Sequence, residues 1–346
     1  MKIVKKVLDE IYRCYAAGHV TVDGKLRVVL ASEEKDGPCY AYFGNNFENK
    51  EVIWENAGGT MSFVEIPHTN GEFLAVQKFF PGFNSLNAKI VWGKYVEGKW
   101  VVKDFLALPY VHRFDIIESE GKLFFLGATL CGSKTERNDW ADPGMIWVGE
   151  LPKDSDQKME IKPIHDFLLK NHGFCRGYYE NSQAGFITCD SGIYVVLPPK
   201  DGRDWKVRQI LAGRISDAAS YDLDGDGIDE LAIIAPFHGN ELAIYKKEND
   251  RRYKVVYEYP NEMDFAHAIW AGTLLGKPAV VFGIRRMDCE LGYIMYNPAT
   301  GQYNTTIIEK GVGTANVDIV HEDGREILIA ANHTKNEAAI YFITES

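Results

Sequence analysis

Short runs in which apolar and polar residues alternate recur along this chain, and most of them end at a glycine-centred turn. In one case His19-Val-Thr-Val-Asp23 alternates, Gly24 marks the turn, and the largely apolar run Leu26-Arg-Val-Val-Leu30 follows. Such alternation over about four to eight residues predicts a half-buried β-strand, and two such runs flanking a turn predict a β-hairpin. The sequence therefore predicts an all-β protein built from hairpins.

The same hairpin is repeated. When the turn glycines are placed in register, a strand opens nine residues before each of them. The pairs are Ser62 with Gly71, His112 with Gly121, Arg176 with Gly185, Ala218 with Gly227, His267 with Gly276 and Ala315 with Gly324, and a shorter version surrounds Gly24. A third apolar strand follows every hairpin, and a fourth often follows that. Four strands at a period of roughly 50 residues are typical of one blade of a β-propeller.

The two ends of the chain predict how the ring closes. The last unit stops after three strands, whereas residues 3–12 match the fourth-strand pattern and precede the first inner strand. A helix over residues 3–12 is the alternative, because this segment also has a helical period. We predict one domain over residues 1–346, a seven-bladed β-propeller of four-stranded antiparallel blades whose N-terminal strand closes the last blade. The predicted blades are about 13–57, 58–108, 109–170, 171–213, 214–261, 262–310, and 311–346 plus 2–12.

Composition and charge narrow the class of protein. Hydrophobic residues make up 46% of the chain, and no apolar run approaches the roughly 20 residues of a membrane helix. The net charge of -11 disfavours binding to nucleic acid. Acidic residues follow the start too early for a signal peptide, and the six cysteines are scattered, as expected of reduced thiols. These features predict a cytoplasmic protein that binds neither nucleic acid nor membranes; its oligomeric state stays open.

One hairpin carries the oxygen ligands that a hard cation needs. Asp222, Asp224 and Asp226 alternate along the turn, Ile228 stands at the seventh position and Glu230 at the ninth. An EF-hand would place its last carboxylate at position twelve between two helices. We therefore predict a structural calcium site in a β-hairpin. The other hairpins lack the full pattern.

Propeller geometry sorts the polar residues by face. The start of each innermost strand and the turn after each second strand share one face, which we call the histidine face; the turns between the first and second strands form the opposite, hairpin face. Six of the nine histidines are predicted on the histidine face: His19, His112, His172, His238, His267 and His333. The calcium loop belongs to the hairpin face.

Neutral imidazoles favour zinc-like metals. Blades five, six and seven supply His238, His267 and His333, and three nitrogens with an open position are typical of a catalytic metal site. We predict zinc or another divalent transition metal on these three residues, with His112 or His172 as a fourth ligand or a base. Taken singly, a histidine at a strand end is more often a structural side chain than a ligand, and internal duplication alone could explain the matching contexts of His238 and His333.

Two resemblances rest on these motifs. The string Asp222-Leu-Asp-Gly-Asp-Gly-Ile-Asp-Glu-Leu231 resembles the FG-GAP or VCBS-type propeller repeat, in which the loop holds calcium. A longer set, including Phe237-His-Gly-Asn-Glu-Leu-Ala-Ile-Tyr245, Phe265-Ala-His-Ala-Ile-Trp270 and Asn332-His-Thr-Lys-Asn-Glu-Ala338, is similar to the propeller part of the aldos-2-ulose dehydratase (anhydrofructose dehydratase) family. This second resemblance covers mainly residues 215–343, and the chain has no length left for that family's cupin-like domains.

The second resemblance implies a carbon–oxygen lyase that removes water from a keto-sugar or ulose. The metal would polarise the carbonyl, and His112 or His172 would take the adjacent proton. Arg176, or Arg285 with Arg286, would bind substrate oxygens, and Tyr178 would protonate the departing hydroxide. Lys78 and Asp217 complete the expected substrate-binding set.

Several alternatives to this function stay open. The arginines could instead form surface ion pairs. The propeller could also bind a carbohydrate or a protein without catalysis, or act as a polysaccharide lyase on uronates. The insertion at residues 132–144 is predicted to shape access to the histidine face, the alternative being a solvated loop.

Overall fold

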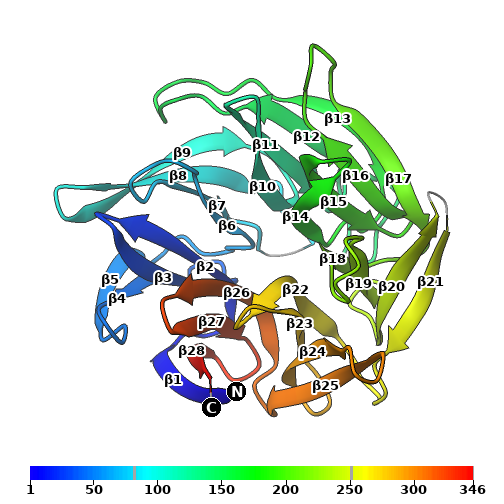
Figure 1. Ribbon diagram of the computed structural model, residues 1–346. Helices are drawn as coiled ribbons and strands as arrows, with labels where there is room; N and C mark the ends of the chain where they lie inside the picture. Colours follow the sequence, from blue (N-terminus) through cyan, green and yellow to red (C-terminus); the bar gives the residue numbers. More distant parts are fainter. Residues whose placement is uncertain (81–82, 250–251, 346) are drawn as a thin grey trace.

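The computed structural model describes residues 1–80, 83–249 and 252–345. Over these residues the chain forms seven antiparallel sheets of four strands each, arranged as blades around a central axis (Figure 1). The predicted fold class, an all-β seven-bladed β-propeller, is confirmed. Within the described ranges the structure contains no helix with the length and apolar character needed to cross a membrane.

The strands follow one another outward from the axis in each blade. Blade one contains β2 (Cys14–Val22), β3 (Lys25–Ser32), β4 (Cys39–Phe43) and β5 (Asn49–Trp54). Blade two contains β6 (Phe63–Glu65), β7 (Phe73–Gln77), β8 (Lys89–Val96) and β9 (Lys99–Ala107). Blade three contains β10 (Val111–Ser119), β11 (Lys122–Thr129), β12 (Gly144–Glu150) and β13 (Lys162–Leu168). Blade four contains β14 (Phe174–Tyr179), β15 (Ser182–Cys189), β16 (Gly192–Leu197) and β17 (Lys206–Ala212). Blade five contains β18 (Asp217–Tyr221), β19 (Glu230–Ala235), β20 (Glu241–Asn249) and β21 (Arg252–Glu258). Blade six contains β22 (Ala266–Leu274), β23 (Lys277–Ile284), β24 (Leu291–Asn297) and β25 (Gln302–Glu309). Blade seven contains β26 (Thr314–Glu322), β27 (Arg325–Asn332), β28 (Glu337–Thr344) and β1 (Lys2–Glu10).

The N-terminal strand closes the ring. Strand β1 pairs with β28 from Lys2 opposite Thr344 to Glu10 opposite Glu337, so both ends of the chain lie in blade seven (Figure 1). The strand is the outermost of its blade, and its exposed and half-buried residues largely alternate. The fourth-strand prediction for residues 3–12 is confirmed, and the helical alternative is wrong.

Burial falls off from the second strand of a blade to its outer edge. In blade seven, all but one residue of β27 is buried, whereas no residue of β1 is fully buried. The second strand packs between sheet neighbours on both sides and between two adjacent blades, so its apolar side chains leave water completely. Each fully buried aliphatic side chain contributes about 1.5–3 kcal/mol of hydrophobic stabilisation. The stable frame is therefore the inner part of every blade, which carries the site described below.

Blade four corrects the register that the glycine pattern predicted. Its hairpin turn is formed by Glu180 and Asn181, with φ of 50° and 60°, whereas Gly185 lies inside β15. Asparagine tolerates the left-handed conformation better than most residues, so a glycine is not required there. The residue nine places before Asn181 is His172. This histidine, and not Arg176, takes the position that His112 and His267 hold in their blades.

A repeated β-bulge marks that position. Tyr15, His112, His267 and Ala315 each stand nine residues before a turn glycine, and each lies at an interruption of the ladder between the first two strands of its blade. A bulge adds one unpaired residue and changes the direction of its side chain. Three of the four bulges therefore turn a tyrosine or a histidine toward the centre of the ring.

Candidate metal centre

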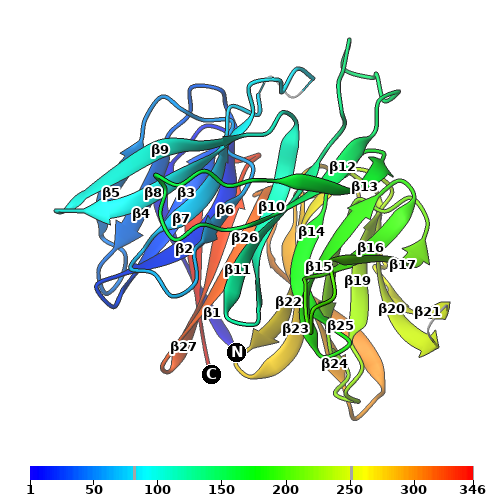
Figure 2. The ribbon, with the colours of Figure 1, turned by 90° about the horizontal axis from the view of Figure 1, so that it is seen from above.

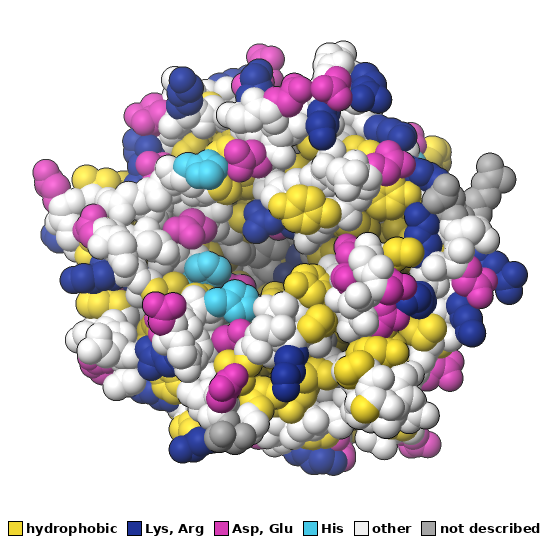
Figure 3. Space-filling view, viewed as in Figure 1, with side chains coloured by type: hydrophobic (Ala, Val, Ile, Leu, Met, Phe, Trp, Pro, Cys, Tyr) yellow, Lys and Arg dark blue, Asp and Glu magenta, His cyan; other side chains and the backbone are white. Residues whose placement is uncertain are grey.

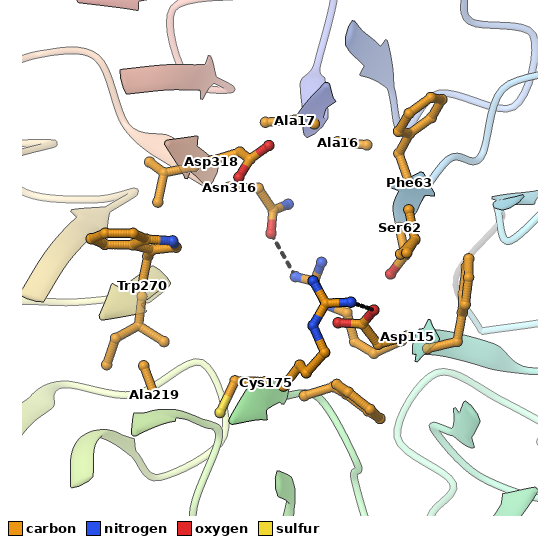
Figure 4. Close-up of a pocket in the computed structure, with 18 of the residues that line it drawn as sticks. Ala16, Ala17, Ser62, Phe63, Asp115, Cys175, Ala219, Trp270, Asn316 and Asp318 are labelled. Atoms are coloured by element: carbon orange, nitrogen blue, oxygen red, sulfur yellow. Dashed lines mark hydrogen bonds and ion pairs between the residues drawn. The ribbon is translucent and has the colours of Figure 1, made fainter. Parts of the chain in front are cut away.

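The innermost strands of all seven blades line a cavity of about 540 Å³ (Figure 4). It opens on the hairpin face, which is hollowed at its centre (Figure 3). The loop that follows β11 rises on the opposite, histidine face (Figure 2). At the inner end of the cavity stand Arg113 and Asp217. The histidines of the repeated position lie behind these two residues, toward the histidine face.

Four aromatic side chains form this closed end. Tyr15, His172 and His267 are each 2% exposed, and His112 is 4% exposed. Nδ1 of His112 lies 3.2 Å from the carbonyl oxygen of His172, and Nδ1 of His267 lies 2.7 Å from that of Ala315. A carbonyl oxygen can only accept, so in both rings Nδ1 carries the proton and Nε2 keeps its lone pair. Both Nε2 atoms face the Tyr15 hydroxyl, at 3.5 and 3.2 Å.

Two of these histidines, His172 and His267, converge with a third, His238. One nitrogen each of His172, His238 and His267 lies within 4.8 Å of the other two. Both ring nitrogens of His172 are buried and lack a hydrogen-bond partner among the described residues. A buried polar atom without a partner is costly, and a bound cation would satisfy it. The donor set therefore fits a transition metal that prefers nitrogen ligands.

The electrostatics of the cluster keep its rings neutral. Burial, reinforced by neighbouring positive groups, holds the pKa of His172 and of His267 well below the ordinary value. Burial and the nearby Arg285 lower the pKa of His238 to about 3. Metal binding requires unprotonated imidazole, so these rings need not lose a proton at neutral pH.

The turn after β19 holds His238 in place. Its backbone is in the left-handed region, with φ of 50°, and its amide donates to Ser216 Oγ at 3.1 Å. The ring lies between Phe237 and Phe265, with centroid separations of 4.1 and 4.3 Å. A non-glycine residue with positive φ is uncommon and indicates a conformation imposed by its surroundings. Trp140, in the insertion at 132–144, packs on Phe237 at 5.5 Å, which places the insertion over this part of the histidine face.

His333 does not join the three converging histidines. Its Nε2 lies 2.6 Å from Oε1 of Glu33, and Arg285 lies 2.8 Å from its Nδ1. Burial lowers the pKa of His333, and Glu33 partly opposes that effect. The structure thus brings His238 and His267 together with His172, whereas the blade order had suggested His333 as the third member. The ring of Tyr15 links the two groups, with centroids 5.2 Å from His267 and 6.4 Å from His333.

Glu33 is, with Tyr15, one of the two residues of this site that the sequence reasoning missed. It directly follows β3, is 3% exposed, and also accepts a hydrogen bond from Nε of Arg13 at 2.7 Å. Burial alone would raise the pKa of Glu33, but the hydrogen bond from His333 and the charges of His333, Arg285 and Arg13 lower it overall. Its only sequence signal is an acidic residue immediately after a buried second strand, on the histidine face.

Asp217 lies on the channel side of the cluster. It is 7% exposed, and its Oδ2 is 3.9 Å from Nδ1 of His172. Burial raises the pKa of Asp217 to about 7, although the charge of Arg113 opposes the shift. Gly173 permits this approach, because a Cβ there would lie 2.2 Å from Oδ1 of Asp217.

The other candidates are dispersed. His19 lies within β2, not before it, and faces Asp318 in the channel at 2.6 Å. Arg176 lines the same cavity and pairs with Asp115 at 3.2 Å, whereas Tyr178 is 68% exposed and lines a separate groove.

The remaining predicted cations lie in the turns after second strands. Lys78 directly follows β7 and is exposed. Arg286 is exposed and pairs with Asp264, while Arg285 contacts His333. The structure therefore keeps Arg285 near the histidines and separates Tyr178 from them.

The predicted calcium loop joins β18 to β19. Carboxylate oxygens of Asp222, Asp224 and Asp226 lie within 4.8 Å of one another. Oδ1 of Asp224 and Oε1 of Glu230 are buried without a hydrogen-bond partner among the described residues. This donor set fits calcium. The ammonium of Lys246, however, forms ion pairs with Asp224, with Asp226 at 2.7 Å and with Glu230 at 3.4 Å.

Calcium and the Lys246 ammonium would compete for the same oxygens. We therefore expect Lys246→Met to increase the stabilisation of the protein by calcium. A ligand present at 100 times its Kd stabilises the folded state by about 2.7 kcal/mol. Thermal unfolding with calcium and with a chelator measures the effect, and Lys162→Met, which removes an exposed ion pair with Asp204, is the control. A variant whose calcium response equals that of the wild type would refute the competition.

Comparisons with known proteins agree with the fold. The architecture and the channel define a seven-bladed β-propeller, and residues 215–249 match the FG-GAP repeat. The chain is similar to the β-propeller domain of Cps50 (Swd1) from Myceliophteria thermophila, with 11% sequence identity and a TM-score of 0.59 over 99% of this chain and 100% of that one. No curated protein matches the sequence. At this identity the structural likeness shows the fold alone.

Proposed function

We propose that this β-propeller is a metal-dependent carbon–oxygen lyase that removes water from a small keto-sugar or ulose at the histidine face. The observation that carries the proposal is the convergence of His172, His238 and His267, with His172 buried and both its nitrogens without a partner. A purely structural histidine normally bonds through at least one nitrogen. The resemblance of residues 215–343 to aldos-2-ulose dehydratases supports this reaction class.

The residues around the three histidines suit α-proton abstraction. A divalent metal held by these imidazoles would supply a Lewis acid that polarises the substrate carbonyl. His333 is the proposed base: Glu33 accepts the proton of its Nε2, and its Nδ1 lone pair, which accepts a hydrogen bond from Arg285 in the free protein, would take the proton next to the carbonyl once Arg285 turns to the substrate oxygen. Arg285, beside that Nδ1, would stabilise the negative charge that develops on the substrate oxygen.

The departing hydroxide needs a proton donor, and Tyr15 is the proposed one. Burial raises the pKa of Tyr15 to about 12, so the phenol stays protonated at neutral pH. When the carbon–oxygen bond breaks, its electron pair leaves with the hydroxide, which takes the Tyr15 proton and departs as water. The electron pair of the broken carbon–hydrogen bond forms the new carbon–carbon double bond. This role had been expected of Tyr178, which lies too exposed and too far from the cluster.

Dehydration of 1,5-anhydrofructose or a glycosid-ulose tests the proposal. The unsaturated product can be followed by its ultraviolet absorbance. We expect turnover in the metal-loaded protein, a loss of at least about 100-fold after chelation, and recovery on adding zinc, manganese or nickel. Full activity in metal-free protein would refute the mechanism. A protein that binds these sugars without converting them, with or without metal, would instead be a binding module.

A further inference from the structure

The channel cavity is a separate site from the metal centre. It opens on the hairpin face, and none of His112, His172 or His267 is among the residues that line it. Its volume of about 540 Å³ lies within the range of small-molecule pockets, roughly 300–1,000 Å³. The proposed reaction on the histidine face leaves this cavity without a role.

Most charges in the cavity are paired with each other. Arg176 pairs with Asp115 at 3.2 Å, and His19 pairs with Asp318 at 2.6 Å. Glu65, near the mouth, is half-buried and accepts a hydrogen bond from the Thr21 amide. The two ion pairs need no ligand to balance them, whereas Glu65 has no ion-pair partner among the described residues.

Two opposite charges at the inner end are not paired. Arg113 donates to the carbonyl oxygen of Met61 at 3.0 Å and to Oδ1 of Asn316 at 2.8 Å, and within the described residues it forms no ion pair. Among the described residues Asp217 accepts only the Ala218 amide, at 2.9 Å, and its Oδ2 lies 3.9 Å from Nδ1 of His172, whose ring is neutral. A guanidinium has five N–H donors, so Arg113 retains donors for an anion.

The wall between mouth and inner end offers apolar surface. Trp270 and Phe63 lie on opposite sides of the cavity, and Asn316 projects between them toward its centre (Figure 4). An aromatic ring binds the apolar body of a ligand and can also stabilise an ammonium group. The inner end thus combines a cation and a carboxylate that form no Lys–carboxylate or Arg–carboxylate pair among the described residues, and an aromatic wall lies next to them.

We propose that the channel binds a small zwitterion, such as an amino acid, with its carboxylate on Arg113, its ammonium on Asp217 and its apolar body against Trp270. Each charge of the ligand would form an ion pair with a buried group of opposite sign. A molecule with both charges would therefore bind more tightly than a molecule with only one of them.

Calorimetric titration of the full chain tests the site. The probes are L-phenylalanine and the ω-amino acids from glycine to 6-aminohexanoate, with hexylamine and hexanoate as singly charged controls. We expect at least one zwitterion to bind with a Kd below about 1 mM, and both controls to bind at least about tenfold more weakly. No binding by any zwitterion, or equal binding by hexylamine or hexanoate, would overturn the proposal.

Two variants locate the charges. Arg113→Gln should make the best zwitterion bind no better than hexylamine, and Asp217→Asn should make it bind no better than hexanoate. Arg203→Gln and Asp201→Asn, which break an exposed ion pair, are the matched controls. Unchanged binding in both channel variants would refute the assignment. If either variant fails to fold, the wild-type panel of zwitterions and singly charged controls still decides.

The proposal of a channel site and the proposal of a lyase can be refuted independently of each other. Binding is to be measured in His267→Ala and in chelated wild type, where the proposed lyase is inactive but the cavity lining is intact. Zwitterion binding that persists there supports a site distinct from the metal centre. Binding that is lost together with the metal would contradict a separate site.

Discussion

Replacing His172 with alanine is expected to lower the affinity for zinc by more than about 100-fold and to abolish lyase turnover. Changes to groups that only support a metal ligand typically cost 10–100-fold in affinity, and loss of one of three ligands costs more. Because His172 is 2% exposed and both nitrogens lack partners, its removal also relieves an unsatisfied buried group. Metal-free His172→Ala should therefore be about as stable as metal-free wild type.

Competition with a zinc chelator of known affinity measures the effect. His68→Ala is the control, because His68 is 73% exposed in its side chain and pairs only with Glu118 on the surface. Metal retention at wild-type affinity in His172→Ala, with a normal unfolding temperature, would exclude His172 as a ligand.

Glu33→Gln is expected to reduce turnover by about 100-fold or more, because a positioned general base contributes roughly 10²–10⁴. The carboxylate of Glu33 raises the pKa of His333 through its hydrogen bond and charge. Without it, the pKa of His333 falls further, and the base is weaker. Activity requires neutral His333 and is lost as pH falls through that pKa, so the acidic limb of the pH profile should move to lower pH.

The dependence of turnover on pH separates this role from a structural one. Glu34→Gln, which removes a more exposed partner of Arg13, serves as the control. Metal content should be unchanged in Glu33→Gln, because the hydrogen bonds of the Glu33 side chain among the described residues go to Arg13 and His333 and not to the converging three. A drop in turnover without any shift of the acidic limb would show that Glu33 only supports the fold.

The overall fold was predictable because turn chemistry repeats. Glycine-centred hairpins recur with the nine-residue spacing, and residues 3–12 completed the last blade as predicted. The same spacing located His112 and His267. It failed in blade four, where Glu180 and Asn181 adopt the left-handed turn that glycine adopts elsewhere, so Gly185 was misplaced into the turn.

That register error carried into the candidate site. It placed Arg176 at the start of its strand and Tyr178 beside the histidines, whereas His172 holds the equivalent position and Tyr178 is largely exposed. The third converging histidine could not be read from blade order, because the distance of a side chain from the axis depends on bulges and turn conformation. Glu33 gave only one weak signal, an acidic residue directly after a buried second strand. Its role follows from burial and from contacts between blades one and seven, which neighbouring residues in sequence do not encode.

X-ray absorption at the zinc edge of zinc-loaded wild-type protein tests the central claim most directly. Three imidazole ligands would give nitrogen neighbours at about 2.0–2.1 Å together with the outer-shell scattering of imidazole rings. We predict this pattern in the wild type with about one zinc per chain, and its loss in His172→Ala. A protein that binds no zinc, or binds it through oxygen or sulfur without imidazole scattering, would contradict the account.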